Sequence, residues 1–210
     1  MFMNPHEPTA YIAPTLVGLS GAVGVIRYVL PDIVRNLKRG IFLTKRYILI
    51  SISNLNYSIQ RSLLLFSLMT VAVTGMLAIL ASNIHSPREF TTGVIGYVVV
   101  IVLLVVSIIY KLSMEAMTRK TLFLNLWKIG YTKKELNKIV RQEVISYYFV
   151  LILIPLVYIV FISGRFIYYG DMSLQFAFIY VLSYVIPIII SGFITYVQYI
   201  NTVVKPFKGG

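Results

Sequence analysis

The stretch that decides the fold is Ser62–Ile84, which reads SLLLFSLMTVAVTGMLAILASNI. It contains no charged side chain, and it is long enough as a helix to cross the core of a bilayer, which takes about 20 apolar residues. The whole chain is 58% hydrophobic and only 12% charged, whereas about a quarter of the residues in a soluble domain are charged. The sequence therefore predicts a multi-pass membrane protein.

Four further stretches are long and apolar enough to cross, so we expect an all-α fold with about five transmembrane helices. The expected spans are 10–30, 62–84, 92–110, 144–164 and 174–200. Arg27 lies only about one turn from the end of the first span, where a long side chain can reach the interface; a role as an intramembrane charge is the alternative. Pro155 and Pro187 fall inside the last two spans and predict kinks. Tyrosines near the span ends are typical of interfacial belts: Tyr147, Tyr148, Tyr168, Tyr169, Tyr196 and Tyr199.

Basic residues predict the orientation of these spans. The connections 31–61 and 111–143 are strongly basic, whereas 85–91 and 165–173 are short and nearly neutral. Basic loops remain in the cytoplasm, which places the N-terminus outside and the C-terminus inside. The net charge of +12 then indicates contact with anionic lipid at the cytoplasmic face rather than binding of nucleic acid.

The cytoplasmic segment 41–61 reads IFLTKRYILISISNLNYSIQR. Its apolar residues recur at roughly helical spacing and are flanked by polar and charged ones, a pattern typical of a helix that lies in the interface plane. Its β-branched residues weaken the helix prediction, so a loop with a short turn is the alternative.

A second cytoplasmic segment, 119–143, lies between two spans. Gly130 is a natural stop for a helix over 122–129. Thr132 and Glu135 then have the spacing of a capping box, in which each side chain binds the backbone N–H of the other residue. We therefore expect a short helix, a break at Gly130, and a second helix that leads into the span 144–164. An ordinary solvated basic loop is the alternative.

Catalytic chemistry has little support in the sequence. The chain has no cysteine and two histidines, and it has no GxxxxGK[ST] segment to hold a nucleotide phosphate. The expected spans contain no His, Asp or Glu, which argues against an intramembrane enzyme. We expect a protein that is not an enzyme and that binds no cofactor.

The residues Leu126–Leu136, LWKIGYTKKEL, resemble the cytoplasmic segment of FtsX-like ABC transporter permeases. That family has a Leu-basic-x-Ile/Leu-Gly-x-Ser/Thr core followed by basic residues, an acid or Gln, and Ile or Leu. The resemblance covers roughly 41–204 and is strongest to the C-terminal half of the Gram-positive permeases that handle antimicrobial peptides. It divides the chain into an extra N-terminal span with a basic linker, 1–40, and a permease domain, 41–210.

The resemblance implies that a separate ATPase subunit docks on a coupling helix within 119–143. The residues that would make this contact are Leu126, Trp127, Lys128, Ile129, Gly130, Thr132, Lys133, Lys134 and Glu135. It further implies a permease subunit in a bacterial cell membrane, paired with a second permease chain or with another copy of itself. Export or extraction of a peptide or lipid-like substrate is the function that would follow.

Two features depart from the family pattern. Many members have a Glu eight residues before the Gly, where this chain has Leu122, and many have a large extracellular domain where this chain has only 85–91. Substrate handling by such a domain does not carry over. A non-transporting membrane scaffold, or a regulatory or mechanotransmission subunit, is the alternative function.

Overall fold

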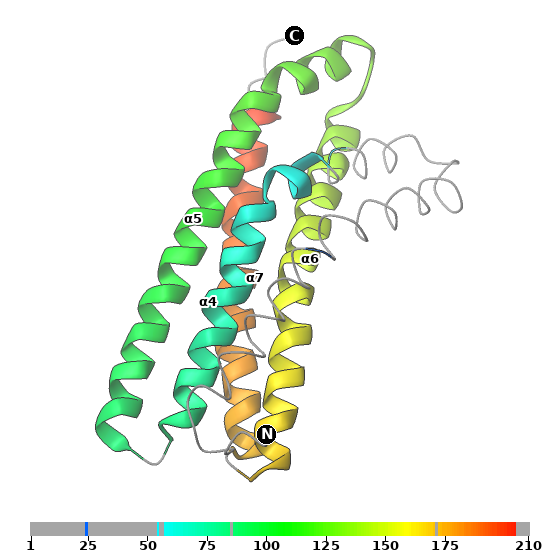
Figure 1. Cartoon of the computed structure of the whole chain (residues 1–210). Helices are drawn as coiled ribbons and strands as arrows, with labels where there is room; N and C mark the ends of the chain where they lie inside the picture. Colours follow the sequence, from blue (N-terminus) through cyan, green and yellow to red (C-terminus); the bar gives the residue numbers. More distant parts are fainter. Residues whose placement is uncertain (1–23, 25–53, 55–56, 85, 171, 205–210) are drawn as a thin grey trace.

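The computed structural model describes residues 24, 54, 57–84, 86–170 and 172–204, and this part is helical with no strand. Its long helices are α4 (Leu63–Ser82), α5 (Pro87–Lys128), α6 (Lys133–Tyr168) and α7 (Leu174–Val203), shown in Figure 1. All four are long and apolar enough to cross a membrane. The predicted spans between 62 and 200 are thus confirmed as helices. The predicted first span, the basic linker and most of the segment 41–61 lie outside the described residues.

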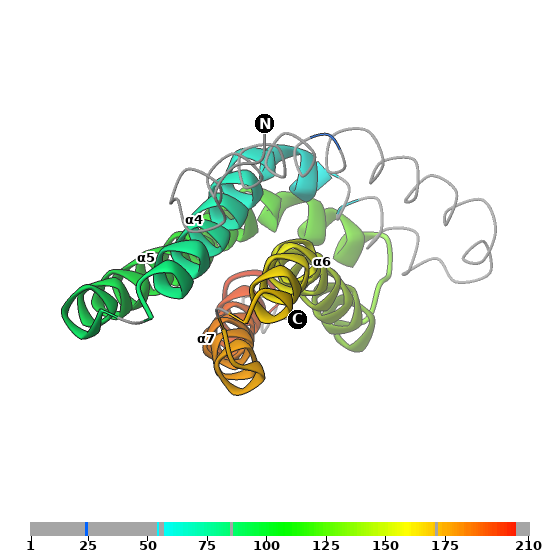
Figure 2. The ribbon, with the colours of Figure 1, turned by 60° about the horizontal axis from the view of Figure 1, so that its bottom comes forward.

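The four helices form a bundle in which α4 and α7 each pack against both α5 and α6. Going round the bundle, the order is α4, α5, α7, α6, so that α5 and α6 are diagonal partners (Figure 2). The core is formed by apolar side chains from all four helices, among them Phe66, Met69, Ile108, Leu151 and Ile188. α5 and α6 are therefore held together along the spans mainly through α4 and α7.

Helix length differs strongly between the elements. α4 has 20 residues, about 30 Å at 1.5 Å per residue, which matches the hydrocarbon thickness of a bilayer. α5 has 42 residues and α6 has 36, so both extend well beyond the predicted spans 92–110 and 144–164. The short helix expected over 122–129 is not a separate element. It is the end of α5, because no Gly or Pro interrupts the chain between Gly96 and Gly130.

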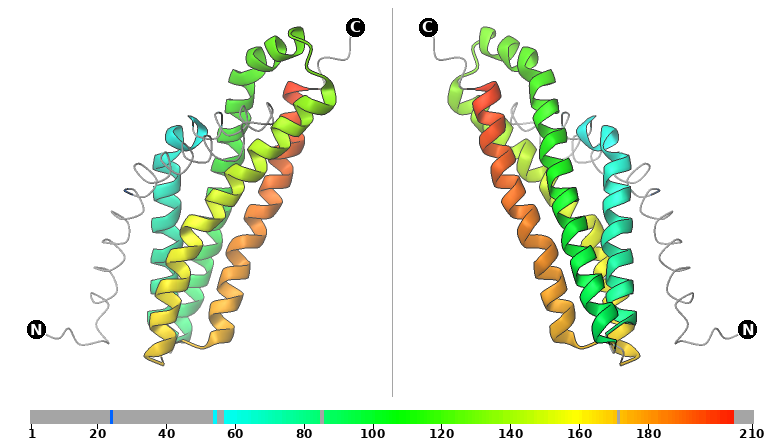
Figure 3. Two further views of the ribbon diagram at one scale, coloured as in Figure 1. Left: turned by 90° about the vertical axis from the view of Figure 1, so that its right-hand side faces the viewer. Right: turned by 90° about the vertical axis from the view of Figure 1, so that its left-hand side faces the viewer.

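The extra length lies at one end of the bundle (Figure 3). Ser62, just before α4, is hydrogen-bonded to Lys111 of α5 and Tyr147 of α6, which fixes the level at which α4 begins. Beyond that level α5 and α6 continue for about 20–25 Å and meet in the turn 129–132; we call residues 112–146 the protruding hairpin. The end of α4, the start of α5, the end of α6 and the start of α7 lie at the opposite end (Figure 1).

Several tyrosines have a different place from the one expected. Tyr147, Tyr148 and Tyr199 are buried inside the bundle, whereas Tyr168 and Tyr169 are exposed at the end of α6. Tyr148 forms a hydrogen bond of 2.8 Å with Thr195 of α7. The prediction of an interfacial belt is wrong for the buried three, because each can pack its ring on neighbouring helices, as Tyr199 does on Phe123.

Candidate coupling segment and buried ionic cluster

At the tip of the protruding hairpin, α5 ends in a regular C-terminal cap. Gly130 has a φ of +104°, a left-handed conformation that glycine adopts without strain. The amide of Tyr131 donates to the carbonyl of Leu126 at 3.1 Å, and the amide of Gly130 donates to that of Trp127 at 3.0 Å. This pair of bonds is a Schellman motif, which satisfies carbonyls at the end of a helix. The predicted break at Gly130 is confirmed.

The next helix begins with the predicted capping box. The amide of Thr132 donates to the Glu135 carboxylate at 2.8 Å, and the amide of Glu135 donates to the Thr132 hydroxyl at 3.3 Å. The Thr132 hydroxyl itself donates to the same carboxylate at 2.9 Å. These bonds hold the pKa of Glu135 below its usual value, the backbone N–H of Thr132 contributing most. α6 therefore starts at a defined residue, directly after the turn.

The apolar residues of the candidate coupling segment, Leu126–Glu135, differ in how exposed they are. Leu126 and Trp127 are partly buried and pack against the core, and the Lys133 ammonium lies 5.5 Å from the centre of the Trp127 ring. Ile129, in contrast, is 77% exposed. Within Leu126–Glu135, Ile129 is thus the exposed large apolar side chain, and exposed charged side chains flank it: Lys128, Lys133, Lys134 and Glu135.

A buried ionic cluster lies at the base of the hairpin. Arg119 of α5 forms ion pairs with Glu115, one turn earlier, and with Glu143 of α6. The three residues are 8%, 8% and 5% exposed. Removing one member of such a group leaves an uncompensated buried charge and costs about 3–5 kcal/mol. The ion pair with Glu143 joins α5 to α6 where the hairpin leaves the bundle.

The same cluster binds the segment before α4. The hydroxyl of Ser58 donates to the Glu115 carboxylate at 2.6 Å and accepts from Arg119 at 2.8 Å. Arg119 also donates to the backbone carbonyl of Asn54 at 3.3 Å, and the Asn54 amide donates to Glu143 at 3.4 Å. Residues 57–61 are helical, and Figure 1 shows them running across the start of α4.

Residues 57–61 are helical and belong to the segment 41–61, for which an interfacial helix is predicted; most of that segment lies outside the described residues. Ser58 and Ile59 are buried, whereas Tyr57, Gln60 and Arg61 are exposed. One face of this piece therefore packs on the bundle and the other is free, as expected for an amphipathic helix.

Sequence reasoning missed the ionic cluster, although part of the signal was present. Glu115 and Arg119 have the i,i+4 spacing of an ion pair on one helix face. Glu143 falls at helical spacing from Leu136, Ile139 and Val140, which are all buried, so it belongs to the apolar face of α6. A carboxylate on a buried face requires a cationic partner. The sequence does not say which of the many basic residues that partner is.

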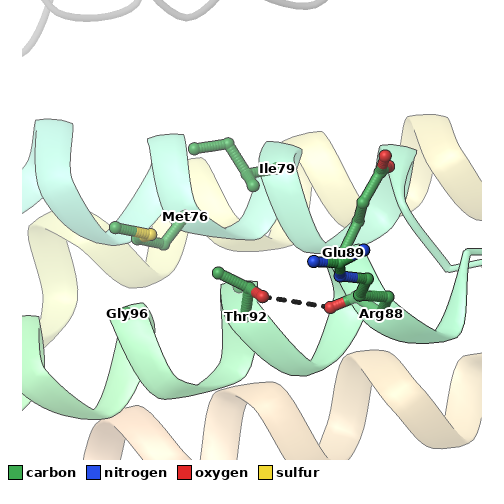
Figure 4. A pocket seen from close by; sticks show the side chains of 7 residues that line it. Met76, Ile79, Arg88, Glu89, Thr92 and Gly96 are labelled. Atoms are coloured by element: carbon green, nitrogen blue, oxygen red, sulfur yellow. Dashed lines mark hydrogen bonds between the residues drawn. The ribbon is translucent and has the colours of Figure 1, made fainter.

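A groove between α4 and α5 lies at the other end of the bundle (Figure 4). Its volume is about 440 Å³ and its walls are mainly apolar, with two charged side chains. The lining residues are Met76, Ile79, Arg88, Glu89, Thr92, Gly93 and Gly96. A Cβ at Gly93 would lie 3.0 Å from the Leu80 side chain, so the glycine permits close approach of the two helices there.

The described part of the chain brings no group of three or more His, Cys, Asp or Glu together as metal ligands. The two carboxylates of the ionic cluster are occupied by Arg119. The cluster thus joins α5 and α6 through ion pairs.

Comparison with protein-family models, with curated proteins and with solved structures finds no match for this chain. The fold alone defines the class: a multi-pass, all-helical membrane protein. Its special features are a helical hairpin that protrudes from the bundle and a buried ionic cluster at the base of that hairpin.

Proposed function

We propose that this chain is the transmembrane permease subunit of an ABC transporter, driven by a separate ATPase subunit that docks on the tip of the protruding hairpin. The observation that carries the proposal is the continuity of α5 and α6. Each runs as one helix from the opposite end of the bundle to the turn 129–132. A force applied to that turn acts directly on two spans, without a flexible linker between.

The tip has the surface that such a partner requires. Ile129 is the strongly exposed apolar residue, and the lysines on either side are exposed. Ion pairs between exposed groups contribute only about 0–1 kcal/mol each, so the apolar contact of Ile129 would dominate the affinity. Leu126 and Trp127, which pack against the core, would support the tip and contribute less surface of their own.

The transported substrate would be a peptide or a lipid-like molecule, exported or extracted from the membrane. Apolar side chains on the surface of α5, α6 and α7 suit an amphipathic substrate better than a hydrophilic solute, which requires polar groups along its path. The functional unit would contain a second permease chain or a second copy of this one. The proposed setting is a bacterial plasma membrane, with anionic lipid against the basic hairpin.

A pull-down tests this proposal. The tagged full-length chain, purified from its native cells in mild detergent, should bring down a stoichiometric P-loop ATPase identified by mass spectrometry. Ile129→Ser should reduce the recovered ATPase and its ATP turnover at least fivefold. Leu122→Ser is the matched control, since Leu122 is also an exposed apolar residue of the hairpin, 43% exposed, but lies seven residues from the tip residue.

The same pull-down also distinguishes the proposed permease from the alternative function. A non-transporting scaffold or regulatory subunit needs no ATPase, so purification without any P-loop protein would favour it. Equal loss from Leu122→Ser and Ile129→Ser would show that the tip is not the docking point.

A further inference from the structure

Arg119 is the residue through which three separate pieces of the described chain meet. One guanidinium nitrogen binds Glu143 of α6, and the other binds Glu115 of α5 and both Ser58 and Asn54 ahead of α4. We propose that Arg119 is a positioning residue that ties Asn54 and residues 57–62 to the protruding hairpin, so that the hairpin and the start of α4 move as one body. The inference rests on the proposed function and extends it: a displacement that the ATPase produces at the hairpin tip would also be transmitted to α4.

The geometry favours arginine specifically. The guanidinium is a planar fork with five donors, and it divides them between the two carboxylates and the polar groups of the segment. A lysine ammonium at this position has the same charge but only three donors at one point. A lysine would keep an ion pair with one carboxylate and lose the contacts that the second guanidinium nitrogen makes.

Stability alone does not explain the cluster. Two carboxylates share one guanidinium, and Oε2 of Glu115 is buried without a hydrogen-bond partner among the described residues. Buried ionic groups of this kind are often no more stabilising than well-packed apolar residues of the same size. What apolar residues would not supply are the directional bonds to Asn54 and Ser58.

The segment has a second fixed point at its other end. Ser62 accepts from the hydroxyl of Tyr147 at 2.9 Å and from the ammonium of Lys111, which also donates to the carbonyl of Arg61 at 3.0 Å. These contacts lie where α4 begins, whereas the Arg119 contacts lie beyond it on the hairpin. With both points in place, the segment has one orientation relative to the hairpin; with Ser62 alone, it can rotate about the start of α4.

Distances between spin labels test this connection directly. Labels can be attached to introduced cysteines alone, because the chain contains no native cysteine. One label pair, at Gln60 and Lys134, joins the segment to the hairpin tip. The other, at Lys120 and Lys134, lies within the hairpin. All three labelled positions have exposed side chains. Distances are measured by pulsed electron paramagnetic resonance on the full chain in lipid nanodiscs.

Two variants and one control are compared. In R119K, and in the triple variant E115L/R119M/E143L, the distance distribution of the Gln60–Lys134 pair should become at least twice as broad, while that of the Lys120–Lys134 pair stays narrow. The triple variant removes all three charges together, so it should keep the thermal stability of the parent. R141K makes the same chemical change at an exposed arginine of the hairpin and should leave both distributions unchanged.

An unchanged, narrow Gln60–Lys134 distribution in both cluster variants would overturn the inference, as would equal broadening of both label pairs, which would mean general loosening. The measurement needs no ATPase. A failed pull-down would therefore contradict docking of an ATPase but not the role of Arg119. A narrow distribution in the variants would contradict the role of Arg119 but not the docking site.

Discussion

The hydroxyl of Tyr184 in α7 donates a hydrogen bond of 3.0 Å to the backbone carbonyl of Leu151 in α6. Leu151 lies four residues before Pro155, and proline has no N–H with which to continue the helix ladder. The carbonyl that proline leaves free is thus satisfied by a side chain from the neighbouring helix. Both residues are fully buried, where an unpaired carbonyl is unfavourable.

Tyr184→Phe should therefore destabilise the bundle by about 1–3 kcal/mol, the cost of a buried polar group left without a partner. The loss is measured by unfolding the reconstituted protein in mixed micelles with increasing sodium dodecyl sulfate. Tyr168→Phe is the control, since Tyr168 is 85% exposed, and it should change stability very little.

A second variant shows whether the proline is the cause. Pro155→Ala restores an amide to the carbonyl of Leu151, so Tyr184→Phe should be less destabilising in that background. Equal effects of Tyr184→Phe with and without Pro155 would mean that the hydroxyl acts elsewhere.

The capping box predicts a pH dependence at the start of α6. Because the folded-state pKa of Glu135 is lowered by the amide and hydroxyl of Thr132, the box stabilises the helix start above the ordinary glutamate pKa of about 4.3. That contribution is lost as the pH falls through the lowered, folded-state pKa. Hydrogen exchange of the amides in 132–136, corrected for intrinsic rates, should accelerate over this acidic window.

Glu135→Gln is the matched variant for this prediction, because the amide keeps the hydrogen-bonding shape without the charge. Its protection should be weaker at neutral pH and nearly independent of pH. A pH response as steep as that of the parent would assign the effect to another carboxyl group.

Gly130→Ala should destabilise the hairpin tip by about 1–2 kcal/mol through the backbone, since a left-handed conformation brings the Cβ close to a carbonyl oxygen. There is open space around the position, so packing contributes nothing to the loss. Gly164→Ala, in α6 and also in open space, should instead stabilise by about 1 kcal/mol. Chemical unfolding combined with hydrogen exchange at 126–136 would show a local effect for Gly130 alone.

Gly192→Val should loosen the contact between α6 and α7. A Cβ at Gly192 would lie 3.3 Å from the ring of Tyr148, and that ring is held in place by bonds to Thr195 and Ser191. Since the ring has no room to yield, we expect a loss of about 1–3 kcal/mol from overpacking. Gly164→Val introduces the same side chain without a clash, and a similar loss in that variant would contradict the packing argument.

Local patterns predicted much of the fold. The uncharged run in Ser62–Ile84 became α4, and the break at Gly130 with its capping box appeared as expected, because each depends on neighbours within a few residues. The full length of α5 was not predicted, since the polar residues after Tyr110 suggested a loop. The absence of Gly and Pro up to Gly130 was the signal for a continuous helix.

Contacts between distant residues were the harder part. Arg119 meets Glu143, Ser58 and Asn54 only because the bundle brings three pieces of chain to one place. Nothing in the spacing of these residues identifies them as partners. The same holds for Tyr184, whose hydrogen bond to Leu151 depends on how α6 and α7 pack.

The length of α5 has a mechanical consequence. If the helix tilts about Lys111, where the segment ahead of α4 holds it, its arms measured along the helix are about 25 Å to its last residue, Lys128, and about 36 Å to Pro87. The far end then travels about one and a half times as far as the near end. The groove between Met76 and Gly96 lies on that far arm. A small displacement at the turn would thus become a larger one at the end of α5 that borders the groove.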